Sequence, residues 1–126
     1  MTKHNQVYKC NICGNIVEIL ETGAGELHCC NQAMVLMTEK TSDEGLEKHV
    51  PVIEKSGSKI KVTVSTTKHP MEKDHHIQWV ELTTKDQVIR KTLKPDQTPI
   101  VEFDLNTNDS PIKARAYCNL HGLWSS

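Results

Sequence analysis

The stretch KIKVTVST, residues 59–66, decides the fold class. Its apolar residues Ile60, Val62 and Val64 alternate with polar ones and therefore share one face of a half-buried strand. Similar short runs follow, separated by turn-forming stretches: KSGSK (55–59), TKHPMEKD (67–74), TTKDQ (83–87), KPDQTP (94–99) and NTNDSP (106–111). Six or seven short strands at near-regular spacing predict an antiparallel β-sandwich of the immunoglobulin-like kind.

The first 36 residues have a different character. They contain four of the five cysteines and too few apolar residues for a core of their own. Units below about 40 residues usually need a metal, disulfides or oligomerisation to fold. We therefore predict a mainly β protein with three parts: a small N-terminal domain stapled by a metal at its four cysteines (1–36), a polar linker (37–48) and the β-sandwich (49–126).

The charge balance excludes several classes of partner. The 126-residue chain has 15 Lys and Arg against 16 Asp and Glu, so no overall field attracts nucleic acid or an anionic membrane. No stretch has the apolar length of a signal peptide or of a span of about 20 residues. We expect a soluble, cytoplasmic protein. In a reducing compartment, five cysteines are better explained as metal ligands than as disulfides.

The N-terminal cysteines have the pattern of a metal site. Cys10 and Cys13 form a C-x2-C knuckle, which presents two thiolates to one metal. Cys29 and Cys30 supply a second pair, but neighbouring side chains in an extended chain point to opposite sides. Both can bind one metal only if the chain turns there. Four thiolates bind zinc or iron, and with iron the site could store one electron but would have no vacant position.

A second group of candidate ligands comprises His49, His69, His75, Cys118 and His121. Three hypotheses compete for it. A Cys-x2-His pair with an upstream histidine on a β-sandwich is typical of blue copper sites, but no methionine follows His121. A closed zinc site would use four ligands and leave one histidine unexplained. Five ligands suit an octahedral iron with one open position.

Five ordered segments resemble desulfoferrodoxin, the two-iron class of superoxide reductase from anaerobic bacteria and archaea. The resemblance runs nearly end to end. The segments are VYKCNICGNIVE (7–18), HCCNQAM (28–34), EKHVPVIE (47–54), HPMEKDHHIQWVEL (69–82) and YCNLHGLW (117–124).

The resemblance implies two iron ions per chain and neither haem nor flavin. An Fe(Cys)4 centre would be held by Cys10, Cys13, Cys29 and Cys30. A catalytic Fe(His)4(Cys) centre would have four equatorial histidines and an axial cysteine, namely His49, His69, His75, His121 and Cys118.

The resemblance also implies the reaction, which is one-electron reduction of superoxide to hydrogen peroxide in defence against oxidative stress. Glu47 would cap the oxidised iron, and Lys48 would be the cation beside the open position. A small protein such as rubredoxin would donate electrons, and the chain would be a homodimer. Two positions depart from the family pattern: His76 replaces an expected aromatic residue and Leu123 an expected histidine.

Two rival functions are compatible with the same residues. A superoxide dismutase would both reduce and oxidise superoxide at one metal. A non-catalytic electron carrier or a zinc-stabilised binding module would lack an open coordination position. The identity of the metal and the presence of that position distinguish these classes.

Overall fold

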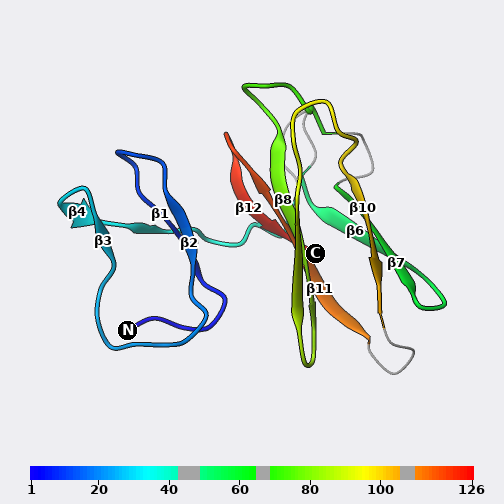
Figure 1. Cartoon of the computed structure of the whole chain (residues 1–126), viewed down its shortest axis with the longest axis horizontal. Helices are drawn as coiled ribbons and strands as arrows, with labels where there is room; N and C mark the ends of the chain where they lie inside the picture. Colours follow the sequence, from blue (N-terminus) through cyan, green and yellow to red (C-terminus); the bar gives the residue numbers. More distant parts are fainter. Residues whose placement is uncertain (43–48, 65–68, 106–109) are drawn as a thin grey trace. The chain divides into compact units, whose positions relative to one another are not determined.

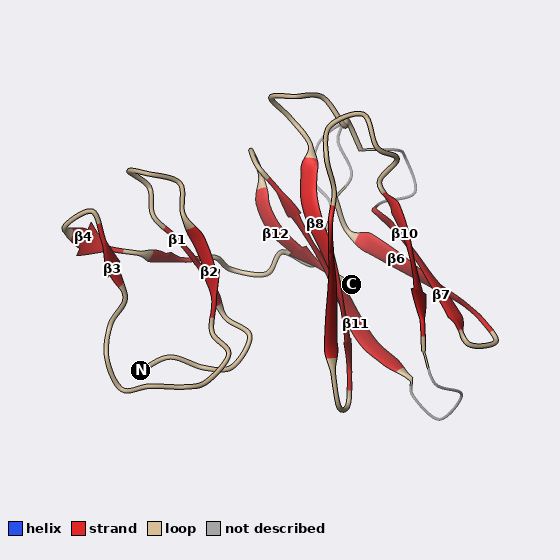
Figure 2. Ribbon diagram, in the orientation of Figure 1, coloured by secondary structure: helices blue, strands red, loops and turns tan. Residues whose placement is uncertain are grey.

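The computed structural model covers the whole chain and describes residues 1–42, 49–64, 69–105 and 110–126. It divides the chain into two compact units, Met1–Thr38 and Glu39–Ser126. All regular elements among the described residues are β-strands (Figure 2). In this part of the chain there is accordingly no helix long and apolar enough to cross a membrane.

The first unit contains a three-stranded sheet of order β2-β1-β5 and a two-stranded hairpin, β3-β4. Its strands are β1 (Val7–Lys9), β2 (Ile16–Glu18), β3 (His28–Cys29), β4 (Gln32–Ala33) and β5 (Val35–Leu36). Only three apolar side chains of its described residues are buried, those of Val7, Cys10 and Ile19. Such a small core contributes little stability, so the fold of this unit depends on the cysteine site.

The second unit contains two antiparallel sheets, of order β10-β7-β6 and β12-β11-β8-β9 (Figure 1). Their strands are β6 (Pro51–Ser56), β7 (Lys59–Val64), β8 (Ile77–Thr84), β9 (Val88–Thr92), β10 (Ile100–Asp104), β11 (Pro111–Cys118) and β12 (Gly122–Ser125). The prediction of a mainly β chain with an antiparallel sandwich is confirmed.

The core lies between the two sheets. Ile60, Val62 and Val64 of β7 are fully buried, as their alternation predicts. The four-stranded sheet contributes Val80, Leu82, Ala114, Ala116 and Cys118 to the same core. Cys118 is the last residue of β11 and has no exposed surface. Its thiol is therefore buried at the end of the core that is formed by the ends of the strands.

The outer face of the four-stranded sheet contains a buried ion pair. Glu81 of β8 is opposite Arg115 of β11, and neither is more than 2% exposed. The Arg115 Nε donates to Glu81 Oε1 over 2.8 Å, and its Nη1 donates to Glu39 Oε1 over 3.0 Å. Lys113 also donates to Glu39, over 2.8 Å. The pairing and its hydrogen bonds reduce the cost of burying these charges, and they hold Glu39 against the sheet.

Residues 43–48 of the predicted linker, including Glu47 and Lys48, lie outside the described residues. The domain limits at residues 36 and 48 therefore stay predictions.

Candidate metal centres

The four N-terminal cysteines come from two turns. Cys10 and Cys13 follow β1, and Gly14 closes that turn with a φ of 84°. Cys29 ends β3, and the next two residues, Cys30 and Asn31, both have left-handed φ, 54° and 61°. A two-residue hairpin loop with positive φ at both central positions reverses the chain at once. The chain therefore turns between the adjacent cysteines, as binding of one metal requires.

The spacing of these thiols fits a tetrahedral metal. All four Sγ atoms lie within 4.8 Å of one another. The Sγ of Cys29 is 3.6 Å from that of Cys13 and 3.9 Å from that of Cys30. Metal–sulfur bonds of about 2.3 Å at tetrahedral angles separate sulfurs by about 3.8 Å. The turns thus hold the thiols at the separations that a metal with four thiolate ligands requires.

The ionisation of the thiols favours a bound cation. Backbone N–H groups of Cys13 and Ile12 stabilise the thiolate of Cys10 and lower its pKa to about 6. Hydrogen bonding with Cys13 raises the pKa of Cys29, and raises that of Cys30 to about 12. The Cys10 thiol therefore loses its proton readily, whereas the Cys29 and Cys30 thiols tend to keep theirs. A bound metal cation favours the thiolate form of all of them, because it balances their negative charges.

The second group is assembled from three segments of the sandwich. His49 precedes β6, and His69 and His75 precede β8. Cys118 ends β11, and His121 lies in the turn between β11 and β12. One donor atom of each residue lies within 4.8 Å of the others. The structure thus brings together all five residues predicted for this site. His76, the neighbour of His75, is not part of the group.

The four imidazole rings are neighbours in a closed cycle. In the order His49, His69, His75, His121 and back to His49, the ring centroids are 4.5, 4.8, 5.1 and 4.9 Å apart. Successive rings are inclined by 60° to 86°. The four imidazoles thus form a ring of neighbours, and the Cys118 thiol is the fifth donor of the group.

Individual donor atoms can be assigned. The His69 Nδ1 lies 2.7 Å from the Pro70 carbonyl oxygen, which can only accept, so Nδ1 carries the proton and Nε2 is the nitrogen with a metal-binding lone pair. The His49 Nε2 and His121 Nδ1 are 3.2 Å apart. Two nitrogens bound at right angles with bonds of about 2.1 Å would be about 3.0 Å apart. The donor set and its spacing fit a metal with several imidazole ligands.

Asn119 connects the two loops that carry most of these donors. Its Nδ2 donates to the Asp74 carbonyl over 2.9 Å, and its Oδ1 accepts from the His76 backbone N–H over 2.9 Å. Its own N–H donates to the His76 carbonyl over 3.2 Å. These bonds flank His75 on both sides. Asn119 therefore fixes the backbone of His75 relative to Cys118 and His121, a role that only its place between two ligands could have suggested.

Trp124 makes a further contact that the sequence did not predict. Its ring stacks on His49, with centroids 4.5 Å apart and planes inclined by 12°. Trp124 is only 5% exposed. The stack fixes the plane of the His49 imidazole, so Trp124 is more than a packing residue. Glu47 and Lys48 lie outside the described residues.

The fold and the two donor groups define a class: a β-sandwich metalloprotein with a separate cysteine metal site. Sequence comparison gives the family. The desulfoferrodoxin family profile matches residues 41–126, and the profile of the desulfoferrodoxin N-terminal domain matches residues 2–37. The chain belongs to the desulfoferrodoxin family, as the five segments predicted. It accordingly has two iron centres, one for each donor group.

Individual relatives cover most of the chain. A desulfoferrodoxin homolog of Methanothermobacter thermautotrophicus is 52% identical over 98% of this chain and 99% of its own length. A superoxide reductase of Pyrococcus abyssi is 36% identical over 74% of this chain and 96% of its own. The crystal structure of the superoxide reductase from Treponema pallidum is similar with a TM-score of 0.83 and 32% identity, covering 96% of each chain.

The left-handed conformation of Asn31 leads to a test of the cysteine site. Asn31→Val places a β-branched residue at φ 61°, which costs roughly 1–2 kcal/mol and strains the turn between Cys29 and Cys30. We expect faster loss of the Fe(Cys)4 absorption in the presence of a chelator. Asn31→Gly, which accepts this conformation, is the matched control and should retain iron like the wild type. Equal rates for both variants would contradict the role of the turn.

Proposed function

We propose that this protein is a superoxide reductase. One superoxide, one electron and two protons give one hydrogen peroxide. The observation that carries the proposal is the cycle of four imidazoles with a buried thiol as fifth donor, since five donors leave one position of an octahedral metal open. The relatives named superoxide reductase support it.

The ligands of the two centres follow from the donor groups. In the catalytic centre, iron would be held by His49, His69, His75, His121 and Cys118. In the N-terminal centre the ligands are Cys10, Cys13, Cys29 and Cys30. Iron bound at the catalytic group supplies the electron and an open coordination position.

The surroundings of the five donors favour a small anionic substrate. The imidazoles are neutral when they bind a metal, and one thiolate does not cancel the charge of a divalent or trivalent ion, so the centre is positive. Cys118 is fully buried, and His49 and His69 are each 3% exposed, whereas His121 is exposed. The thiol is therefore shielded from water, whereas the donor group reaches the protein surface at His121.

Glu47 and Lys48 complete the site in this proposal. They directly precede the donor His49 in the chain, and they match the family residues that cap the oxidised iron and attract superoxide. The negative charge of the Glu47 carboxylate at the oxidised iron would oppose the approach of a second superoxide anion. That distinguishes a reductase from a dismutase, which must react in both oxidation states.

The remaining partners are proposed on the properties of the first unit. Ile12 lies between Cys10 and Cys13 and is 61% exposed, which provides an apolar contact for a small electron-donor protein such as rubredoxin. Val17, Val35 and Leu36 of the β2-β1-β5 sheet are also exposed, and they support a homodimer formed through this unit. The balanced charge and the five cysteines, none of which forms a disulfide, favour a cytoplasmic protein.

The peroxide yield tests the proposed reaction. With fully reduced protein in single turnover, we expect about one hydrogen peroxide per superoxide consumed. Cys118→Ser should abolish this, because a serine hydroxyl is not ionised and cannot replace the thiolate ligand. Cys13→Ser is the matched control: it removes a ligand of the other centre and should leave the single-turnover yield unchanged. A yield near one half would indicate dismutation, and no consumption above background an electron carrier or binding module.

The proposed role of Lys48 predicts a rate effect without loss of iron. A positive charge about 5 Å from an incoming anion contributes roughly 1–3 kcal/mol, so Lys48→Ala should slow the bimolecular reaction with superoxide by about tenfold or more. The difference should shrink at high ionic strength. Lys48→Arg, which keeps the charge, should react nearly like the wild type. Pulse radiolysis measures the rate constant, and an unchanged constant in Lys48→Ala would remove Lys48 from the site.

The proposed role of Glu47 predicts a spectroscopic effect in the oxidised protein. If its carboxylate caps the ferric centre, Glu47→Ala should shift the sulfur-to-iron charge-transfer band, because the iron would then have a different neighbouring group. The reaction of the reduced protein with superoxide should change little. Glu54→Ala, at an exposed position of β6, is the control. Identical oxidised spectra of Glu47→Ala and the control would refute the cap.

A further inference from the structure

The segment Glu39–Lys40 is attached to the last strand of the sandwich. The Lys40 N–H donates to the Leu123 carbonyl over 3.0 Å, and the Lys40 carbonyl accepts from the Ser125 N–H over 2.8 Å. These bonds make a parallel bridge between Lys40 and Trp124. Together with the ion pairs of Glu39, they hold the segment in one place on β12.

From this anchored position the Lys40 side chain reaches the catalytic donor group. Its ammonium donates to the His121 carbonyl oxygen over 3.0 Å and lies 5.1 Å from the centroid of the Trp124 ring. Trp124 in turn stacks on His49. Lys40 thus contacts one donor residue directly and a second one through the indole.

The ammonium of Lys40 is in contact with solvent. A hollow of about 420 Å³ is lined by Glu39, Lys40, Thr41, Ser42 and Trp124, and Lys40 is exposed. Water therefore hydrates the ammonium. Solvent also screens the charge, so its effect on the centre is modest and depends on salt.

We infer that Lys40 is a positioning residue of the catalytic centre, which supports His121 and the Trp124–His49 stack and adds a fixed positive charge beside them. This inference rests on the proposed function for the identity of the centre. A nearby positive charge favours the less positive, reduced state and therefore raises the reduction potential. It also favours the binding of anions. Lys40 and Lys48 would then attract superoxide from two different segments of the chain.

The test uses full-length, iron-loaded protein and two measurements that need no superoxide: the midpoint potential of the catalytic iron and the Kd of its ferric form for azide. Lys40→Met keeps most of the length of the side chain but removes the charge. We expect a lower midpoint potential and an azide Kd about threefold higher at low ionic strength, with the difference shrinking as salt is added. Lys40→Arg should restore both values.

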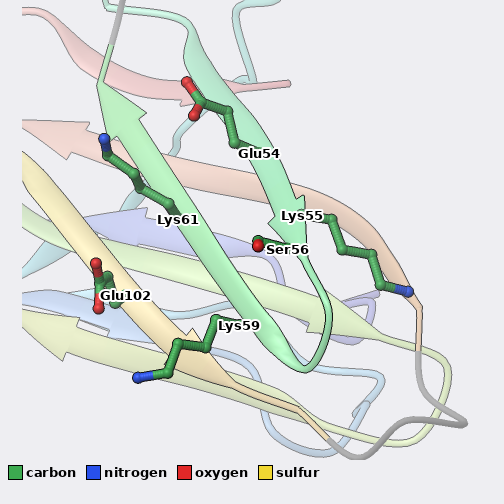
Figure 3. A pocket seen from close by; sticks show the side chains of 6 residues that line it. All are labelled: Glu54, Lys55, Ser56, Lys59, Lys61 and Glu102. Carbon is green, nitrogen blue, oxygen red and sulfur yellow. The ribbon is translucent and has the colours of Figure 1, made fainter.

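The chain provides a matched control and an internal reference. Lys55 is an exposed lysine at the end of β6, beside a hollow of about 320 Å³ that it lines with Glu54, Ser56, Lys59, Lys61 and Glu102 (Figure 3). Lys55→Met removes the same charge away from the donor group and should change neither value. The potential of the Fe(Cys)4 centre should stay constant in all variants.

Two results would overturn the inference: equal values for Lys40→Met and Lys55→Met, or a Lys40→Arg variant that behaves like Lys40→Met. Failure of the proposed function would look different. A protein that consumes no superoxide while Lys40→Met still shifts the potential and the azide Kd would refute the reductase and leave the role of Lys40 intact.

Discussion

The pairing of β8 with β11 is the constraint on which the catalytic group depends. Cys118 ends β11 opposite Ile77 at the start of β8, and a register shift lies between Tyr117 and Cys118. This pairing places the loop that ends in His75 beside the loop that runs from Cys118 to His121. Asn119 then fixes the two loops with side-chain hydrogen bonds. The regular hydrogen bonding of the sheet therefore sets the approximate positions of the donors, and the loops complete their placement.

The two units are stabilised by different interactions. The sandwich has a core from both sheets and a buried Glu81–Arg115 pair on its outer face. The first unit has almost no core, and hydrogen bonding with Cys13 raises the pKa of the Cys29 and Cys30 thiols. A cation that balances the thiolates therefore contributes directly to folding in the first unit, whereas in the sandwich a metal binds to a fold that the core already stabilises.

Much of this arrangement could be predicted from the sequence. Alternation identified β7, and the spacing of cysteines and histidines identified two donor groups that the structure does bring together. Other features depend on contacts distant in the sequence. Glu81 lies between Val80 and Leu82, so the alternation of the strand predicts that it is exposed. It is buried instead, and it is paired with Arg115 on the neighbouring strand. Nothing near Lys40 in the chain indicates that it reaches His121. The turn at Cys30 was required by the chemistry, but only the structure gives its left-handed form.

The bridge between Lys40 and β12 has a consequence for aggregation. In the sheet β12-β11-β8-β9 the outer strands are β12 and β9, and an open edge can pair with another chain. The Lys40 backbone forms hydrogen bonds with the Leu123 carbonyl and the Ser125 N–H of β12. The other outer strand, β9, contains the charged residues Arg90 and Lys91. Both edges are thus protected, one by the chain's own backbone and one by charge. A shortened protein that begins at His49 would lose the first protection and expose an apolar edge at Leu123 and Trp124.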